Sequence, residues 1–132
     1  MKRVFFFAVV LLLAITLSAS ASPVERAVVP EVSFDGKYRH GKPRKVVHFE
    51  YSIFVNCDEG PGQAETNGNP LPGMKVKRYK FHGRFTRDGV KSIVRGKYAK
   101  DLSGVTGTLR VIGDVSPSLN NCDSTRQNWA TN

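Results

Sequence analysis

Residues 46–57 have the sequence VVHFEYSIFVNC, a run in which apolar and polar side chains alternate. The odd positions from 47 to 57 are apolar or cysteine, and the even positions from 48 to 56 are polar except for Phe54. Successive side chains of a β-strand point to opposite faces, so the run predicts a long strand with one buried face. Phe54 indicates that the second face is partly covered.

Similar alternation recurs along the chain and predicts further strands, separated by glycine-rich turns. The expected strands cover 32–38, a segment from Met74 through Phe85, 90–98, 104–112 and 127–131. Asp88-Gly89 is a hairpin signal. Residues 90–98 also fit a helical face, but their β-branched side chains and flanking glycines favour a strand.

About seven strands without a helix predict an all-β domain. A sheet with one apolar face must bury it against another, so we expect an antiparallel β-sandwich or a partly open β-barrel. Gly83, Gly96 and Gly107 lie inside expected strands, where glycine marks bulges or places where two sheets approach closely.

Residues 58–73 are rich in glycine and proline and almost free of apolar side chains, which predicts a long surface loop. Its acidic residues, Asp58, Glu59 and Glu65, fit either a solvated loop or a Ca²⁺ site. A protruding loop of this length also fits an extracellular inhibitor or interaction protein, which is our second functional hypothesis.

The N-terminus has the features of a secretory signal peptide, with Lys2 and Arg3 before an apolar run that ends at Leu17 and the small residues 18–22. The run is shorter than the roughly 18–20 residues that a membrane anchor needs. We therefore expect a signal peptide at 1–21 that is cleaved near Ala21, and secretion without a transmembrane anchor.

The mature chain should begin with a flexible leader at 22–31, followed by a single domain at 32–132. The formal net charge of +9 falls to +7 when Lys2 and Arg3 leave with the signal peptide. A charge of this size favours contact with polyanions.

The chain has two cysteines, Cys57 and Cys122. In an exported protein two cysteines most simply form one disulfide, which would tie the C-terminal segment to the end of the 46–57 strand. The alternative is a pair of free thiols in redox or metal chemistry, although the sequence has no Cys-x-x-Cys pair.

Several short motifs resemble those of a group of small exported bacterial proteins of uncharacterised function. They are Gly36, Gly41-Lys42-Pro43, the strand ending in Cys57, Phe81-x-Gly83-x-Phe85, Val94-x-Gly96-x-Tyr98, Gly107-Thr108-Leu109-Arg110 and Cys122-Asp123-Ser124 followed by Trp129-Ala130. The resemblance covers 34–130 and implies export, a β-rich domain and the 57–122 pairing. It implies no catalytic or binding residue, and Thr125 stands where the group often has glycine.

The sequence has no nucleophile elbow, phosphate-binding loop or histidine pair at metal-ligand spacing. His48 and Glu50 share an expected strand face, where they fit either a solvated polar pair or an acid–base or metal site. We expect no catalytic residues, no metal and no cofactor, and an unrecognised hydrolase is our third functional hypothesis.

Positive charge is concentrated between Lys75 and Lys100, where Asp88 is the only acid. At strand spacing, Lys75 and Lys77 share one face, and Lys80 and Arg84 share another. Lys91, Arg95 and Lys97 share a third. The candidate polyanion-binding residues are Lys75, Lys77, Lys80, Arg84, Lys91, Arg95 and Lys97. A solvated sheet edge, protected by lysine against unwanted pairing, fits the same pattern.

Our leading hypothesis is therefore a monomeric, non-catalytic binding or cell-envelope-associated domain. Its expected partner is an anionic cell-wall polymer, a glycan or a lipid surface. Nucleic acid is a weaker alternative, because the aromatic residues Tyr79, Phe81 and Phe85 alternate as core residues and stacking needs exposed rings.

Overall fold

In the computed structural model of the protein, the structure describes residues 29–132. The predicted signal peptide at 1–21 and residues 22–28 of the predicted leader lie outside the described residues. The domain starts one residue earlier than expected, because Glu31 already belongs to the first strand.

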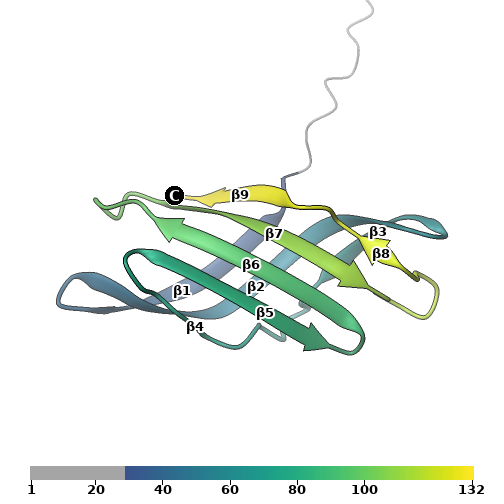
Figure 1. The fold of residues 1–132 in the computed structure, drawn as a ribbon, viewed down its shortest axis with the longest axis horizontal. Helices are drawn as coiled ribbons and strands as arrows, with labels where there is room; N and C mark the ends of the chain where they lie inside the picture. Colours follow the sequence, from purple (N-terminus) through teal and green to yellow (C-terminus); the bar gives the residue numbers. More distant parts are fainter. Residues whose placement is uncertain (1–28) are drawn as a thin grey trace, which may run out of the picture.

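The described part of the chain is all β, and every strand pairing is antiparallel. Figure 1 shows the strands β1 (Glu31–Arg39), β2 (Lys42–Cys57), β3 (Gly60–Glu65), β4 (Met74–Lys75), β5 (Lys80–Arg87), β6 (Val90–Tyr98), β7 (Val105–Gly113), β8 (Cys122–Asp123) and β9 (Gln127–Thr131). The strand predictions from 90 to 98 and from 127 to 131 are confirmed.

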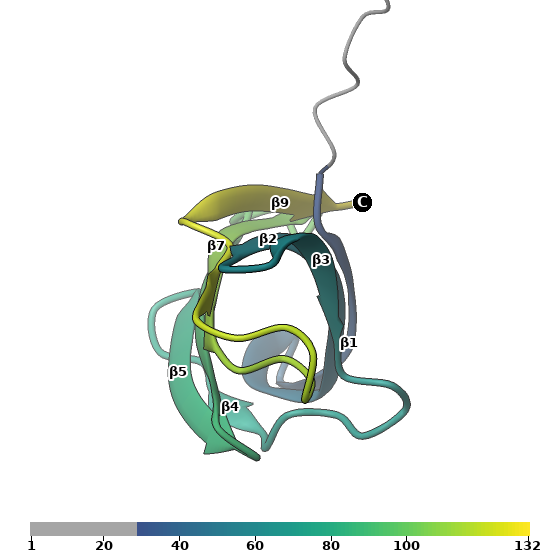
Figure 2. The same cartoon turned by 90° about the vertical axis from the view of Figure 1, so that its right-hand side faces the viewer.

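The strands form one curled sheet, a half-barrel whose two halves face a common core (Figure 2). In the first half, β2 pairs with β1 on one edge and with β3 and β4 on the other. In the second half, β5, β6, β7 and β9 follow one another. The short strand β8 joins the halves, because it pairs with both β2 and β7.

The predicted disulfide is confirmed and lies at this junction. Cys57 ends β2, Cys122 begins β8, and 65 positions separate them in the sequence. In the chain-entropy model, closing a loop of that length stabilises a fold by about 4 kcal/mol. The covalent bond thus reinforces a seam that only a few backbone pairs hold together.

The 46–57 alternation holds only from Phe49 onward. The register between β1 and β2 shifts where one residue of β1 faces two of β2, and His48 there has a φ of 53°. An extra residue of this kind is a β-bulge. Val46 is fully buried as a result, whereas Val47, expected in the buried row, is only half-buried.

The core is built around aromatic rings from both halves. Phe34 and Phe49 stack with centroids 5.7 Å apart, and the Trp129 ring lies 5.9 Å from Phe49 and 6.2 Å from Phe81. Aromatic pairs at such distances add stabilisation beyond their buried area.

The strand glycines provide room for these rings, and they do not mark bulges. Phe81, Gly96, Gly107 and Trp129 lie opposite one another across β5, β6, β7 and β9. A Cβ atom at Gly96 would overlap the Phe81 ring, and one at Gly107 would overlap Trp129. Each ring therefore lies over the backbone of the neighbouring strand.

The expected long loop at 58–73 is wrong, because Gly60–Glu65 forms β3 along the edge of β2. The remaining loop, 66–73, is held to the domain by backbone hydrogen bonds from Thr66 N to Tyr51 O and from Leu71 N to Phe49 O. The Arg87 guanidinium also donates to the carbonyl oxygens of Asn69 and Pro70. The part of the predicted loop that remains is the shorter 66–73 segment, which extends outward from the sheet between β3 and β4 (Figure 2).

Replacing Gly96 with alanine tests the fit between ring and glycine. We expect Gly96→Ala to lower the free energy of unfolding by about 1–3 kcal/mol in urea titrations, because the new methyl group enters space that Phe81 fills. In a Phe81→Leu background the same substitution should cost much less, since the ring is gone. An equal cost in both backgrounds would contradict this packing.

Candidate functional site

The candidate site is the outer face of β5, β6, β7 and β9, which we call the basic face. In β6, Ser92, Val94, Gly96 and Tyr98 are buried, so the alternate residues point outward. Cross-strand pairing sorts the outward side chains into rows. The rows are Lys80–Lys97–Thr106–Ala130, His82–Arg95–Thr108–Asn128, Arg84–Ile93–Arg110 and Thr86–Lys91–Ile112–Asp123.

Five predicted residues, Lys80, Arg84, Lys91, Arg95 and Lys97, share this one face, rather than the separate faces expected from spacing. Four of the strands, β5, β6, β7 and β9, contain no acidic residue. The curled sheet therefore gathers positive charge without neutralising partners inside these strands.

The other two predicted residues are placed differently. Lys77 is bridged to Lys80 across a tight turn, so it extends the first row at the edge of the basic face. Lys75 belongs to β4 and lies opposite Lys45 of β2, in the other half of the sheet. Lys75 is thus not part of the basic face.

Arg126 is a cation of this face that the sequence did not suggest, because it lies far outside the 75–100 segment. It lines a shallow hollow of about 420 Å³ on the basic face, together with Lys80, Arg95, Lys97 and the threonines 106 and 108. The pairing of β9 with β7 brings it there, and only the topology could have revealed that.

The remaining arginine of the face, Arg110, is committed to an ion pair. Its Nη2 and Nε atoms donate to the two carboxylate oxygens of Asp123, at 2.7 and 3.1 Å. Hydrogen bonding to Arg110, and to a smaller extent to the Thr125 backbone N–H, lowers the pKa of Asp123, whereas partial burial raises it. Because Asp123 lies on β8, the pair fastens the seam strand to β7.

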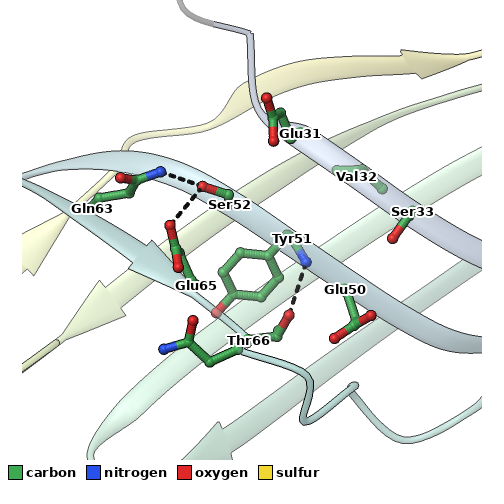
Figure 3. A pocket seen from close by; sticks show the side chains of 10 residues that line it. Glu31, Val32, Ser33, Glu50, Tyr51, Ser52, Gln63, Glu65 and Thr66 are labelled. Atoms are coloured by element: carbon green, nitrogen blue, oxygen red, sulfur yellow. Dashed lines mark hydrogen bonds between the residues drawn. The ribbon is translucent and has the colours of Figure 1, made fainter.

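The opposite half of the sheet has a different hollow, of about 550 Å³, shown in Figure 3. Three carboxylates line it, those of Glu31, Glu50 and Glu65. Ser52 donates to Glu65 and accepts from Gln63, and Tyr51 N donates to Thr66 Oγ1. Within residues 29–132, no three His, Cys, Asp or Glu side chains are grouped so that they could hold a metal ion.

The other candidate residues have structural partners. His48 does not pair with Glu50; its Nδ1 atom lies 2.9 Å from Asp35 Oδ2. The carboxylates of Asp58 and Glu59 hold the segment before the second cysteine, since they accept from Asn121 and Asn120 respectively. Glu65, which bonds Ser52 instead, does not join them.

Two tyrosines, Tyr51 and Tyr98, are buried in the core. Tyr51 Oη forms a 2.7 Å hydrogen bond with Ser92 Oγ, and burial raises the pKa of Tyr51. Tyr98 Oη is buried without a hydrogen-bond partner. Burial, with a smaller contribution from the adjacent Tyr38, raises the pKa of Tyr98 to about 12.

The Tyr98 phenol makes stability depend on alkaline pH. Its pKa is raised above the unfolded value of 10.0, so its contribution is fully present below pH 10 and is lost as pH rises through about 12. The free energy of unfolding therefore falls as pH rises between these two values. Tyr98→Phe should remove most of that loss in denaturant titrations between these pH values, and an unchanged pH dependence would contradict the assignment.

Comparisons of the chain with protein-family models, with curated proteins and with solved structures gave no match. The resemblance to the exported bacterial group stays a prediction. In the part of the chain that the structure describes, no helix is long and apolar enough to span a membrane.

Proposed function

We propose that the protein is a non-catalytic binding domain that holds an anionic polymer on its basic face. The observation that carries the proposal is a row of three lysines, Lys77, Lys80 and Lys97, placed directly opposite one another. Like charges in directly opposed positions destabilise a sheet. A bound polyanion would remove that repulsion. Binding therefore accounts for the row of lysines, whereas the stability of the free protein does not.

Protection of the sheet edge does not account for the whole face. Lysine on an edge strand blocks unwanted pairing, and this explanation suits Lys80 and Arg84 on β5, which ends the strand order. Arg95 and Lys97 lie on β6, which is paired on both sides by β5 and β7. Their charges protect no edge, so they favour a binding role.

The geometry suits a ligand with repeated charges. Neighbouring strands lie about 4.8 Å apart, and outward side chains recur about every 6.6 Å along each strand. Lys80, Lys97 and Arg95 therefore form a small lattice of cations around the hollow that Arg126 completes. A flexible polymer with closely spaced anionic groups can contact several of these cations at once.

Charge reversal and salt dependence test the proposal. We expect Arg95→Glu and Lys97→Glu each to lower the affinity for a heparin oligosaccharide about tenfold at moderate salt, because each removes one ionic contact and adds a repulsive one. Each should also flatten the dependence of log affinity on log salt. The readout is isothermal titration calorimetry over a salt series.

Lys42→Glu is the matched control, since Lys42 is an exposed strand lysine on β2 opposite Arg39. It should change affinity only slightly.

Lys97→Glu should also raise the free energy of unfolding by up to about 1 kcal/mol, because it places a carboxylate opposite Lys80. Equal losses of affinity in all three variants would mean that the protein is merely cationic. If the wild type shows no detectable binding to the heparin oligosaccharide, the proposal is refuted.

A further inference from the structure

A hollow of about 360 Å³ lies beside the basic face, between β1 and the turn that joins β6 to β7. No side chain of a charged residue lines it, and its lining mixes polar groups with the apolar or aromatic residues Val32, Phe34, Tyr38, Tyr98, Leu102 and Val105. Tyr38 and Leu102 are 53% and 40% exposed, although both are large apolar residues. We call this the tyrosine hollow.

The tyrosine hollow contains an unsatisfied polar atom. Tyr98 is only 2% exposed, and its hydroxyl has no hydrogen bond of regular geometry; the Tyr38 hydroxyl, which contributes to the raised pKa of Tyr98, lies outside that geometry. A buried polar group without a partner costs about 1–3 kcal/mol and calls for an explanation. The Oη atoms of Tyr98 and Tyr38 both lie over Gly36, where an added Cβ would be 2.8 and 3.1 Å from them. An entering ligand would reach the Tyr98 hydroxyl by moving the exposed Tyr38 ring aside.

A third hollow, of about 390 Å³, connects the tyrosine hollow to the basic face. It shares Lys97 and Thr106 with the basic hollow, and Tyr98, Val105 and Thr131 with the tyrosine hollow. The turn after β6 and the end of β9 lie at the same end of the sheet (Figure 1). The three hollows therefore adjoin one another around that end, with cations at one side and aromatic rings at the other, and we call them together the path.

We infer that this path takes an acidic polysaccharide, whose carboxylate or sulfate groups contact the basic face while one sugar ring occupies the tyrosine hollow. The inference rests on the proposed function and names its ligand class. A sugar ring offers an apolar face to Tyr38 and oxygen acceptors to the Tyr98 hydroxyl, which are the two contacts that this hollow can supply.

Single-stranded nucleic acid fits the path less well. Proteins that bind it place aromatic rings among the cations, so that successive bases can stack. The aromatic residues of β5, β6 and β9, namely Phe81, Phe85, Tyr98 and Trp129, point to the inner side of the sheet. The outer rows of these strands contain no ring apart from His82, and Tyr38 lies beyond them.

The test compares a heparin oligosaccharide with inorganic polyphosphate and oligothymidylate, because polyphosphate has anionic groups but no ring. We expect Tyr38→Ala to weaken heparin binding about fivefold, the loss of one aromatic contact, and to leave polyphosphate binding unchanged. Phe54→Ala is the matched control, since Phe54 is 48% exposed and lines none of the three hollows. It should leave both affinities unchanged.

Tyr98→Phe separates a binding role from a structural one. Removal of an unsatisfied hydroxyl should raise the Tm by a few degrees while weakening heparin binding several-fold. A purely structural tyrosine would not show opposite changes in stability and affinity. A rise in Tm with unchanged heparin affinity would therefore overturn the role of Tyr98 in the hollow.

The outcomes distinguish this inference from the proposed function. If no polyanion binds, or if Lys97→Glu has no effect, both fail. Suppose that heparin binds and that Lys97→Glu weakens its binding. If Tyr38→Ala then changes the affinities for heparin and polyphosphate equally, or changes neither, only the sugar-ring inference fails. A Tyr38→Ala loss confined to oligothymidylate would overturn the polysaccharide in favour of nucleic acid.

Discussion

The packing of Phe81 over Gly96 and of Trp129 over Gly107 constrains the rest of the structure. A one-residue slip in register would turn every side chain of a strand to the opposite face. The rings cannot move outward without losing their contacts to Phe34 and Phe49, and a side chain at either glycine position would overlap the ring beside it. The inner face of these strands is therefore committed to the core, and their cations lie outside except for Arg87. At the end of β5, Arg87 instead donates to the carbonyl oxygens of Asn69 and Pro70.

This commitment places mutually repelling charges side by side in the free protein. Stability alone would favour mixed charges across β5 and β6, because opposite charges in directly opposed positions are the stabilising arrangement. The unsatisfied Tyr98 hydroxyl beside the same face is a second local cost. Deviations from local consistency tend to occur at functional sites, and these two lie on one path. The buried Trp129 Nε1 atom also lacks a hydrogen-bond partner, but Trp129 lines none of the three hollows.

Much of the fold could be predicted from period-two alternation, from the Asp88-Gly89 hairpin and from the two cysteines, because these signals are local or unique in the chain. The strand β3 could not, since its pairing with β2 uses backbone groups and its sequence GPGQAE has little apolar pattern. The bulge at His48 likewise has no signal in the alternation. Most of the basic face was predicted, but tertiary contacts bring Arg126 to it and place Tyr38 in the neighbouring tyrosine hollow.

The most direct test of the central claim is a map of backbone amide NMR shifts during titration with a heparin oligosaccharide. The account predicts that the largest shifts fall on the outward rows of β5, β6, β7 and β9 around Lys80, Arg95 and Lys97, and continue to Tyr38. Shifts that are largest around the carboxylates of Glu31, Glu50 and Glu65, or that spread evenly over both halves of the sheet, would contradict it.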